Sequence, residues 1–377
     1  MLRAVLCGLP VVGSVVLSLA PAMPGQAVAQ PWRVWTTQGG LVTAVLVGDA
    51  PSALVGETAP EPTTGRPHSR LVRVDASSAR TVWTQGYRNS NCCGLPVVGW
   101  LDRSRRAFAT GDELVLVTLS GEVVARLDLG GTTLDAAAAG GRMLVGVVRV
   151  RPGAVAHELV AVEGGRVLWR VGFPQLVAVA LSPEGLAAAA SLAAVAVLDG
   201  QTGQVRWRIP LEEGRLVDLA FAPGARLVVA QKTVTGTLRV LAVDGRTGAH
   251  RWTVSLGPTV APAVAVVEGH IVVGDARGRL AALISAAGAV QHRWTDAQGP
   301  VFVARSPQGE VAVATGADVV VRRPDGAVRW RGTVPAGVLY GLRLDGPWLA
   351  AIGSATGDAQ VPDRIWFARM DRAGAVR

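Results

Sequence analysis

The sequence predicts an all-β protein, specifically a β-propeller of four-stranded blades. A motif that ends in tryptophan recurs along the chain, and the segments between its copies are short and rich in Val, Ala and Leu. The two ends of the chain carry complementary parts of one copy. A period of about forty residues with no helical pattern inside it is typical of propeller blades.

The motif is clearest in DGQTGQVRWRIPL at 199–211 and DGRTGAHRWTVSL at 244–256, which both read D-x-x-T-G-x-x-x-W. Looser copies lie at 75–83, 163–169, 286–294 and 324–330, and a copy at 120–129 has Ala125 in place of the tryptophan. Successive tryptophan positions are 36 to 45 residues apart. The residues that define the repeat are Trp83, Trp169, Asp199, Gly203, Trp207, Asp244, Gly248, Trp252, Trp294 and Trp330.

One unit, residues 176–211, shows how the motif fits a blade. It divides into four apolar segments, LVAVALSP, EGLAAAAS, LAAVAVLDG and GQVRWRIPL, which turn residues separate. The Asp of D-x-x-T-G can accept backbone hydrogen bonds and the Gly permits positive φ, so this sequence predicts the turn before the last strand. The tryptophan then lies on the outermost strand, where its ring can cover the gap to the next blade.

The ends of the chain predict how the ring closes. DRAGAVR at 371–377 is the motif cut off before its tryptophan, and PWRVWTTQGG at 31–40 supplies a tail with Trp35 in the matching place. We therefore expect one blade to combine strands from both ends. Seven internal units and this shared unit make eight blades, with seven as the alternative because 41–70 is irregular. Within it, the Pro/Thr/Gly-rich residues 52–70 are predicted to form a surface loop insertion.

Residues 1–29 have the pattern of a secretory signal peptide. Arg3 precedes an apolar run, and Ala27-Val28-Ala29 offers a cleavage site before Gln30, so the propeller is expected to occupy 30–377. An uncleaved segment that associates with a membrane is the alternative. After residues 1–29, no apolar run approaches the roughly 18 residues that a membrane-spanning helix needs. The mature protein is thus expected to be extracytoplasmic, either periplasmic or secreted, where disulfides can form.

The chain is basic but lacks the features of a nucleic-acid-binding protein. Its formal net charge is +9, its arginines are scattered, and Lys232 is the only lysine. A nucleic-acid site would need a basic cluster with stacking aromatic residues. The histidines show no metal-ligand spacing, and no G-x-S-x-G nucleophile motif is present.

With Ala242-Val243-Asp244, Gly248 and Trp252, the repeat resembles the tryptophan-docking repeat of propellers of the pyrroloquinoline quinone (PQQ) type. The resemblance extends over essentially all of the predicted mature chain. This repeat occurs in quinoprotein dehydrogenases, in outer-membrane protein assembly propellers of the BamB type and in other exported proteins. The resemblance therefore implies the fold and leaves the function open.

The adjacent Cys92 and Cys93 lie on the connection between the strand of Trp83 and the next inner strand. The same connection carries Arg88, Asn89 and Asn91, which are candidate polar contacts for a ligand. Two interpretations remain open: the cysteines stiffen a loop or stay buried, or they form a vicinal disulfide in the floor of a ligand site. The resemblance implies that such a disulfide could contact a cofactor, because quinoprotein alcohol dehydrogenases pack a vicinal disulfide on PQQ.

The sequence favours a function without catalysis. Quinoprotein dehydrogenases need an oxygen cage for Ca²⁺ and an aspartate base, and no acidic cluster of recognisable spacing is present. Glu212, Glu213 and Asp218 follow Trp207, and we interpret them as loop residues rather than as a catalytic pair. We predict a monomeric binding or scaffolding module of the cell envelope, without cofactor, that engages a protein, peptide or polymer at its loop face. The alternative is a PQQ-dependent dehydrogenase with a Cys92–Cys93 disulfide near PQQ and Ca²⁺.

Overall fold

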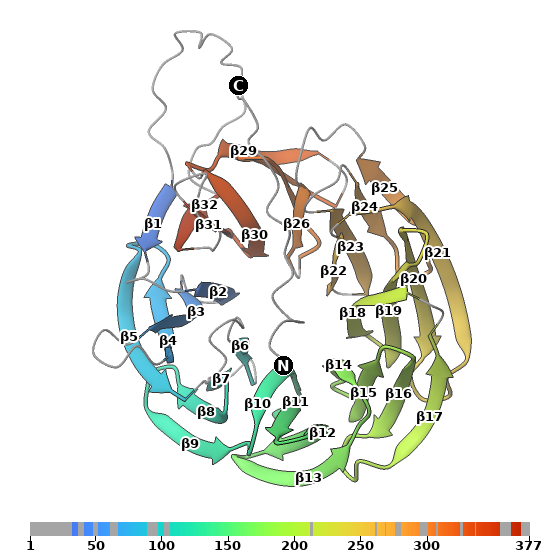
Figure 1. Ribbon diagram of the computed structural model, residues 1–377. Helices are drawn as coiled ribbons and strands as arrows, with labels where there is room; N and C mark the ends of the chain where they lie inside the picture. The colour runs from blue at the N-terminus through green and yellow to red at the C-terminus, as the bar shows by residue number, and fades with distance from the viewer. Residues whose placement is uncertain are drawn as a thin grey trace, which may run out of the picture. The chain divides into compact units, whose positions relative to one another are not determined.

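The computed structural model confirms the predicted fold class, an all-β propeller of four-stranded blades (Figure 1). It describes residues 32–36, 41–47, 52–60, 67–88, 97–101, 106–211, 214–260, 262–267, 269–275, 280–294, 301–306, 308–324, 327–335, 337–354 and 363–370. All of these lie in one compact unit, Pro31–Arg377. The predicted signal peptide, 1–29, lies outside the described residues and stays a prediction.

The described strands form eight four-stranded antiparallel sheets, which we number as blades in chain order. Blade 1 contains β2 (Leu41–Val47), β3 (Ser52–Pro60), β4 (Pro67–Asp75) and β5 (Arg80–Tyr87); blade 2 contains β6 (Val97–Trp100), β7 (Arg106–Thr110), β8 (Glu113–Thr118) and β9 (Val123–Asp128). Blade 3 contains β10 (Thr132–Ala139), β11 (Arg142–Arg151), β12 (Ala154–Glu163) and β13 (Arg166–Gly172); blade 4 contains β14 (Leu176–Leu181), β15 (Leu186–Ser191), β16 (Ala194–Asp199) and β17 (Val205–Pro210). Blade 5 contains β18 (Gly214–Ala222), β19 (Arg226–Thr233), β20 (Thr237–Asp244) and β21 (His250–Pro258); blade 6 contains β22 (Pro262–Val267), β23 (His270–Asp275), β24 (Ala281–Ile284) and β25 (Val290–Trp294). Blade 7 contains β26 (Val301–Arg305), β27 (Val311–Thr315), β28 (Asp318–Arg322) and β29 (Val328–Thr333); blade 8 contains β30 (Val338–Asp345), β31 (Trp348–Ser354), β32 (Arg364–Arg369) and β1 (Trp32–Thr36).

The inner strands of the blades meet in a closed series. Each contacts the inner strand of the next blade, from β2 through β6, β10, β14, β18, β22, β26 and β30 and back to β2. Figure 1 shows these strands nearest to the centre, with the fourth strands at the rim. Blade 8 joins the two ends of the described chain, because β1 pairs with β32 and Trp35 lies opposite Ile365. The predicted closure by strands from both ends is therefore confirmed.

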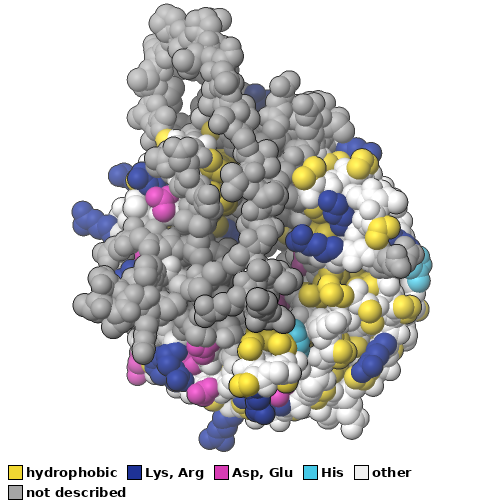
Figure 2. All heavy atoms as spheres, in the orientation of Figure 1, with side chains coloured by type: hydrophobic (Ala, Val, Ile, Leu, Met, Phe, Trp, Pro, Cys, Tyr) yellow, Lys and Arg dark blue, Asp and Glu magenta, His cyan; other side chains and the backbone are white. Residues whose placement is uncertain are grey.

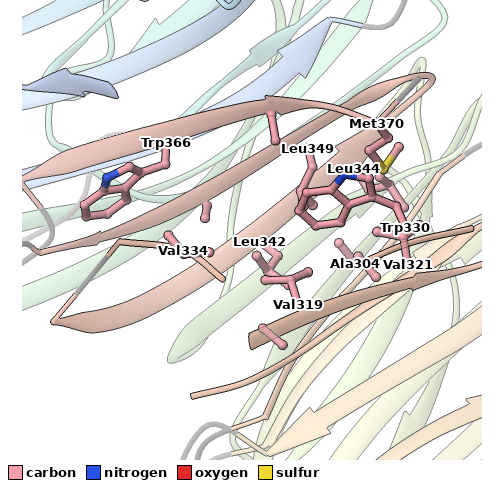
Figure 3. Close-up of a cluster of buried hydrophobic side chains, with 14 of the residues drawn as sticks. Ala304, Val319, Val321, Trp330, Val334, Leu342, Leu344, Leu349, Trp366 and Met370 are labelled. Atoms are coloured by element: carbon pink, nitrogen blue, oxygen red, sulfur yellow. The ribbon is translucent and has the colours of Figure 1, made fainter. Parts of the chain in front are cut away.

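The hydrophobic core is divided among the gaps between blades. Successive residues of a strand point to opposite faces of the sheet, so in β16 Val197 packs toward blade 5 and Leu198 packs toward blade 3. Burial on both faces explains the continuous runs of Val, Ala and Leu, which would be alternating in a sheet with one wet face. Figure 3 shows the cluster between blades 7 and 8, which contains Trp330 and Trp366.

The repeat tryptophans hold neighbouring blades together. The indole N–H of Trp207 donates to the carbonyl oxygen of Gly245 in the next blade at 2.9 Å. Its ring lies against Gly248, whose φ is +77° and where a Cβ would be 3.1 Å from the ring. Glycine is needed there for backbone conformation and for space. The same donation joins Trp83 to Leu119 (2.8 Å), Trp169 to Gly200 (3.1 Å) and Trp252 to Ala286 (3.0 Å).

A β-bulge before the docking tryptophan aims a side chain back at the preceding turn. In blades 4 and 5 the bulged residues are Arg206 and Arg251, which the strand pairing skips. Their guanidinium groups lie 2.6 Å from the carboxylates of Asp199 and Asp244. The arginine, together with backbone N–H groups of the turn, lowers the pKa of each carboxyl to about 2. The Asp of the motif thus organises both the turn and the strand after it.

The remaining tryptophan positions vary this arrangement. Ala125 of blade 2 packs against Gly165 in the tight hairpin of blade 3, where a Cβ would lie 2.7 Å from the Ala125 Cβ. Trp330 is fully buried, and its indole N–H has no hydrogen-bond acceptor among the described residues. Its ring packs edge to face with that of Trp32, with the ring centroids 5.6 Å apart. The side chain of Trp294 lies outside the described residues.

Residues 52–70, which we predicted to form a surface loop, contain β3 and the start of β4. Pro60 and Pro67, two of the prolines that suggested a loop, lie opposite each other at the ends of the strands, where a missing N–H is tolerated. Polar residues of β3 and β4 next to these strand ends pair with each other across the sheet. Thr58 bonds Ser69 at 2.7 Å, and Glu57 receives the guanidinium of Arg70 at 2.9 Å.

Candidate functional site

The antiparallel blades place their loops on two faces. The hairpins between second and third strands and the connections between blades lie on one face, which we call the connection face. The first and third hairpins lie on the other, the turn face. On the connection face the N–H of Leu211 donates to Ala193 at 2.8 Å, and that of Thr259 donates to Gly236 at 2.9 Å. These bonds tie the connections after β17 and β21 to hairpins of the blades before them and hold this part of the face in a fixed conformation.

Of the predicted ligand-binding residues, the described part of the chain includes Arg88. Asn89, Asn91, Cys92 and Cys93 lie outside the described residues, so their proposed ligand contacts stay predictions and both interpretations of the cysteine pair stay open. Arg88 reaches from blade 1 to blade 2. Its backbone N–H donates to Oε1 of Glu113 at 2.8 Å, and its guanidinium lies 3.2 Å from Oδ2 of Asp128. The bond to Asp128, followed by the charge of Glu113, raises the pKa of Arg88.

Glu113 is the anchor of this corner. Its side chain is buried, and besides Arg88 it accepts a hydrogen bond from Arg126 at 2.8 Å. The second Nη of Arg126 donates to the carbonyl of Gly86 at 3.0 Å. A buried carboxylate that holds two arginines and a backbone amide fixes Arg88, which follows β5, against blade 2. Arg88 therefore ties the end of blade 1 to blade 2.

The connection face of blades 3, 4 and 5 carries exposed apolar side chains. Val150 and Val155 lie opposite each other at the tip of the β11–β12 hairpin. Leu192 and Val234 lie in the corresponding turns of blades 4 and 5, and Val260 lies on the connection after β21. Their exposed fractions run from 53% at Leu192 to 76% at Val150. We call these five residues the apolar arc.

Single exposed apolar residues are common on soluble proteins and need no explanation. The apolar arc differs because its members occupy loop positions of three successive blades on one face. In the view of Figure 2, hydrophobic side chains are exposed over the sector of the ring that holds β10 to β21, with Lys and Arg side chains toward its edge. Loops that are apolar, exposed and held by backbone hydrogen bonds are suited to receive a partner.

Two carboxylates lie on inner strands of the same blades. Asp135 of β10 and Asp218 of β18 each follow a β-bulge. Oδ2 of Asp135 accepts the backbone N–H of Val179 in the next blade at 2.8 Å, and Oδ1 of Asp218 accepts that of Leu219 at 2.8 Å. Burial raises the pKa of both carboxyls, that of Asp218 to about 6, and the charge of Asp135 adds to the shift at Asp218.

Asp218, which we interpreted as a loop residue, lies within β18. Glu212 and Glu213, named with it, lie outside the described residues. Asp135 was not identified, because its approach to Asp218 depends on the spatial order of blades 3 to 5. The apolar arc was also missed: Val150, Val234 and Val260 are single residues among many valines. The turn residues beside them, Gly153 and Gly236, were the available signal, since they mark hairpin tips.

Among the described residues, no three or more His, Cys, Asp or Glu side chains come together to hold a metal ion. No helix in the described ranges is long and apolar enough to cross a membrane.

The closed series of four-stranded blades and the indole-to-turn hydrogen bonds define a propeller of the tryptophan-docking, PQQ-like class. A sequence profile of the family described as outer membrane protein assembly factor BamB matches residues 151–294 and 191–339. The two matches together cover half of the chain, and the chain belongs to this family. A search of curated protein sequences found no match.

Solved structures with the same fold include BamB from Moraxella catarrhalis, with 12% identity, a TM-score of 0.58, and coverage of 89% of this chain and 98% of that one. The Dos1 propeller matches at 9% identity and a TM-score of 0.65, covering 90% of this chain and 95% of that one. The C-terminal WD40 domain of Sif2 matches at 14% identity and a TM-score of 0.65, with 90% and 98% coverage. At these identities the likeness shows the shared fold alone.

Proposed function

We propose that this protein is an exported, non-catalytic β-propeller that binds an extended, apolar segment of a partner polypeptide on its connection face. It would serve as a binding or scaffolding module of the cell envelope. The apolar arc is the observation that carries the proposal. The family description, which concerns assembly of outer membrane proteins, and the signal-peptide pattern of residues 1–29 support the cellular setting.

The arc suits an extended chain for a geometric reason. Its members lie at hairpin tips and on a connection, one blade after another, so a partner that touches all of them must cross from blade 3 to blade 5. An extended segment presents a side chain to the same face at every second residue. Burial of an exposed Val or Leu stabilises a complex by about 1.5–3 kcal/mol, and the fixed loops lose little conformational entropy on binding.

The test uses a short fluorescein-labelled peptide in which Leu and Ser alternate, with its binding measured by fluorescence anisotropy. We expect the natural protein to bind it, and Leu192→Glu and Val234→Glu each to weaken binding about tenfold or more, because each places a charge in an apolar contact. The matched control is Val124→Glu. Val124 is 47% exposed but lies on β9 at the rim. Equal binding by all three variants would contradict the proposal.

The absence of catalysis is tested separately. The protein is titrated with PQQ and Ca²⁺ while quinone absorbance is followed, and we expect no stoichiometric binding. Stoichiometric binding that Cys92→Ser abolishes would instead support the dehydrogenase alternative. Export is tested by N-terminal sequencing of the protein recovered outside the cytoplasm, where we expect a start at Gln30.

A further inference from the structure

A cavity of about 390 Å³ lies on the turn face, in the groove between blades 5 and 6. This volume is within the range of about 300–1,000 Å³ that small-molecule sites occupy. Its walls come from the docking site of Trp252 and from the hairpins on either side of it. The lining residues are Gly224, Arg226, Asp244, Arg251, Trp252 and Ala286.

Arg226 is the unusual member of this lining. Its Nη1 donates to the carbonyl of Ala286 at 2.8 Å, which holds the guanidinium in the cavity wall beside Trp252. Among the described residues no carboxylate pairs with it. Asp244, the acid of the cavity, is already engaged: Oδ2 lies 2.6 Å from Nη2 of Arg251, and Oδ1 accepts the N–H of Arg246 at 3.0 Å. Arg226 is therefore a half-buried cation with unused donors.

The corresponding positions in other blades differ. Leu186 lies opposite Asp199 in blade 4 as Arg226 lies opposite Asp244 in blade 5, and Leu186 is buried in the core. In blade 3 the corresponding residue is Arg142, whose Nε donates to its cross-strand partner Glu163 at 2.9 Å. The groove between blades 5 and 6 thus combines two arginines with one carboxylate.

We propose that this cavity binds the carboxylate of a small organic acid that also carries an apolar or aromatic group. The planar guanidinium of Arg226, fixed by its bond to Ala286, can offer its remaining N–H groups to a carboxylate. Arg251 adds positive potential, and Trp252 supplies an apolar wall for the rest of the ligand. The site is on the face opposite the apolar arc, so it does not depend on the proposed function.

The experiment compares benzoate with benzamide by isothermal titration calorimetry on the full protein at low salt. The two probes have nearly the same shape and differ in charge. We expect benzoate to bind and benzamide not to bind. Arg226→Leu, which introduces the blade 4 residue, should weaken benzoate binding about tenfold or more, since a charge-assisted bond is lost. Arg226→Lys keeps the charge without the planar fork and should bind benzoate with intermediate affinity.

Arg142→Leu is the matched control, because it removes an arginine from the same strand position in a blade where a glutamate already pairs with it. It should leave benzoate binding unchanged. Circular dichroism establishes that each variant is folded before titration. Equal binding of benzoate and benzamide, or undiminished benzoate binding by folded Arg226→Leu and Arg226→Lys, overturns the proposal. Tighter binding of phenyl phosphate than of benzoate would overturn the assignment to carboxylates.

Discussion

Gly203 of blade 4 lies against the indole of Trp169 of blade 3. A Cβ at Gly203 would be 2.9 Å from ring carbons of Trp169 and 3.0 Å from a methyl group of Val171. The same turn accepts the indole hydrogen bond through the carbonyl of Gly200 at 3.1 Å. With a φ of +73°, Gly203 carries two independent constraints, one on backbone conformation and one on space.

Substitutions of glycine separate these two constraints. Gly141 has a φ of +81° and nothing within 4 Å of its Cβ position, so Gly141→Ala meets the backbone constraint alone. We expect it to lower the free energy of unfolding by about 1–2 kcal/mol. Gly203→Ala should cost about 1–3 kcal/mol more, because the methyl group overpacks the indole. Urea denaturation measures both, and equal losses would show that the ring imposes no constraint.

Ala79 offers the reverse test in blade 1. It holds the position that glycine holds in the strong repeats, four residues after the Asp of the turn, and it has a φ of +54°. Ala79→Gly should raise the free energy of unfolding by about 0.5–1 kcal/mol, because it relieves a left-handed alanine. Ala249→Gly, in a comparable turn but without positive φ, should not stabilise. A loss of stability in Ala79→Gly would contradict the expectation.

Substitution of Trp35 tests how much the closure of the ring contributes to the free energy of unfolding. It is 8% exposed, and its indole N–H donates to Oγ1 of Thr81 in blade 1 at 3.1 Å. Trp35→Ala should lower the free energy of unfolding by about 3–5 kcal/mol. Thr81→Val removes the acceptor at nearly constant volume and should cost about 1–3 kcal/mol. Thermal unfolding of both variants provides the measurement, and a loss below about 1 kcal/mol for Trp35→Ala would argue that blade 8 adds little stability.

The fold was predictable because its constraints repeat. Asp199 and Trp207 lie eight residues apart, as do Asp244 and Trp252, since the turn, the bulge and the docking ring of each blade need fixed positions. Closure was predictable from Trp35, which completes a motif that the far end of the chain leaves unfinished. The prediction of a loop at 52–70 was wrong because Pro60 and Pro67 lie at strand ends there. Polar residues within the sheet are paired across the strands, as Glu57 is with Arg70.

The site was less predictable, because its residues come from different blades and share no motif. Leu192 and Val234 become neighbours on one face only once the ring has formed. Arg226 stands out only when compared with Leu186 at the same position of the preceding blade. Asp135 and Asp218 are 83 positions apart in the sequence (135 to 218), and their interaction requires blade 4 between them.

Asp199 should make the folded protein less stable as the pH falls below about 4. Its carboxyl has a pKa of about 2 in the folded protein, chiefly through Arg206, against about 3.9 unfolded. The ionised carboxylate therefore stabilises the folded protein above about pH 4, and this stabilisation is lost as the pH falls toward 2. Asp199→Asn keeps the backbone bonds of the turn but loses the ion pair, so it should cost no more than about 1 kcal/mol at pH 7.

Urea denaturation between pH 2 and 7 measures this loss, which should shrink toward the acidic end of the range. In an Arg206→Leu background Asp199→Asn should have little effect at any pH, since the partner is already absent. A loss of the same size at pH 2 and 7 would contradict the assignment to the ion pair.

Asp218 should have the opposite effect and make the folded protein less stable as the pH rises above about 4. Burial and the nearby charge of Asp135 raise its pKa to about 6 in the folded protein, against about 3.9 unfolded. Ionisation therefore opposes folding: the cost is absent below about pH 4 and complete above about pH 7. Asp218→Asn keeps the bond from the N–H of Leu219 and removes the charge. Its free energy of unfolding should exceed that of the natural protein by on the order of 1–3 kcal/mol at pH 8 and match it near pH 4. Urea denaturation across this range measures the difference, and a constant difference from pH 4 to 8 would refute the raised pKa of Asp218. Asp135→Asn tests the coupling of the two carboxyls: it should lower the pKa of Asp218 and so move the pH-dependent change in the stability of the protein to lower pH. No such change in Asp135→Asn would refute the coupling.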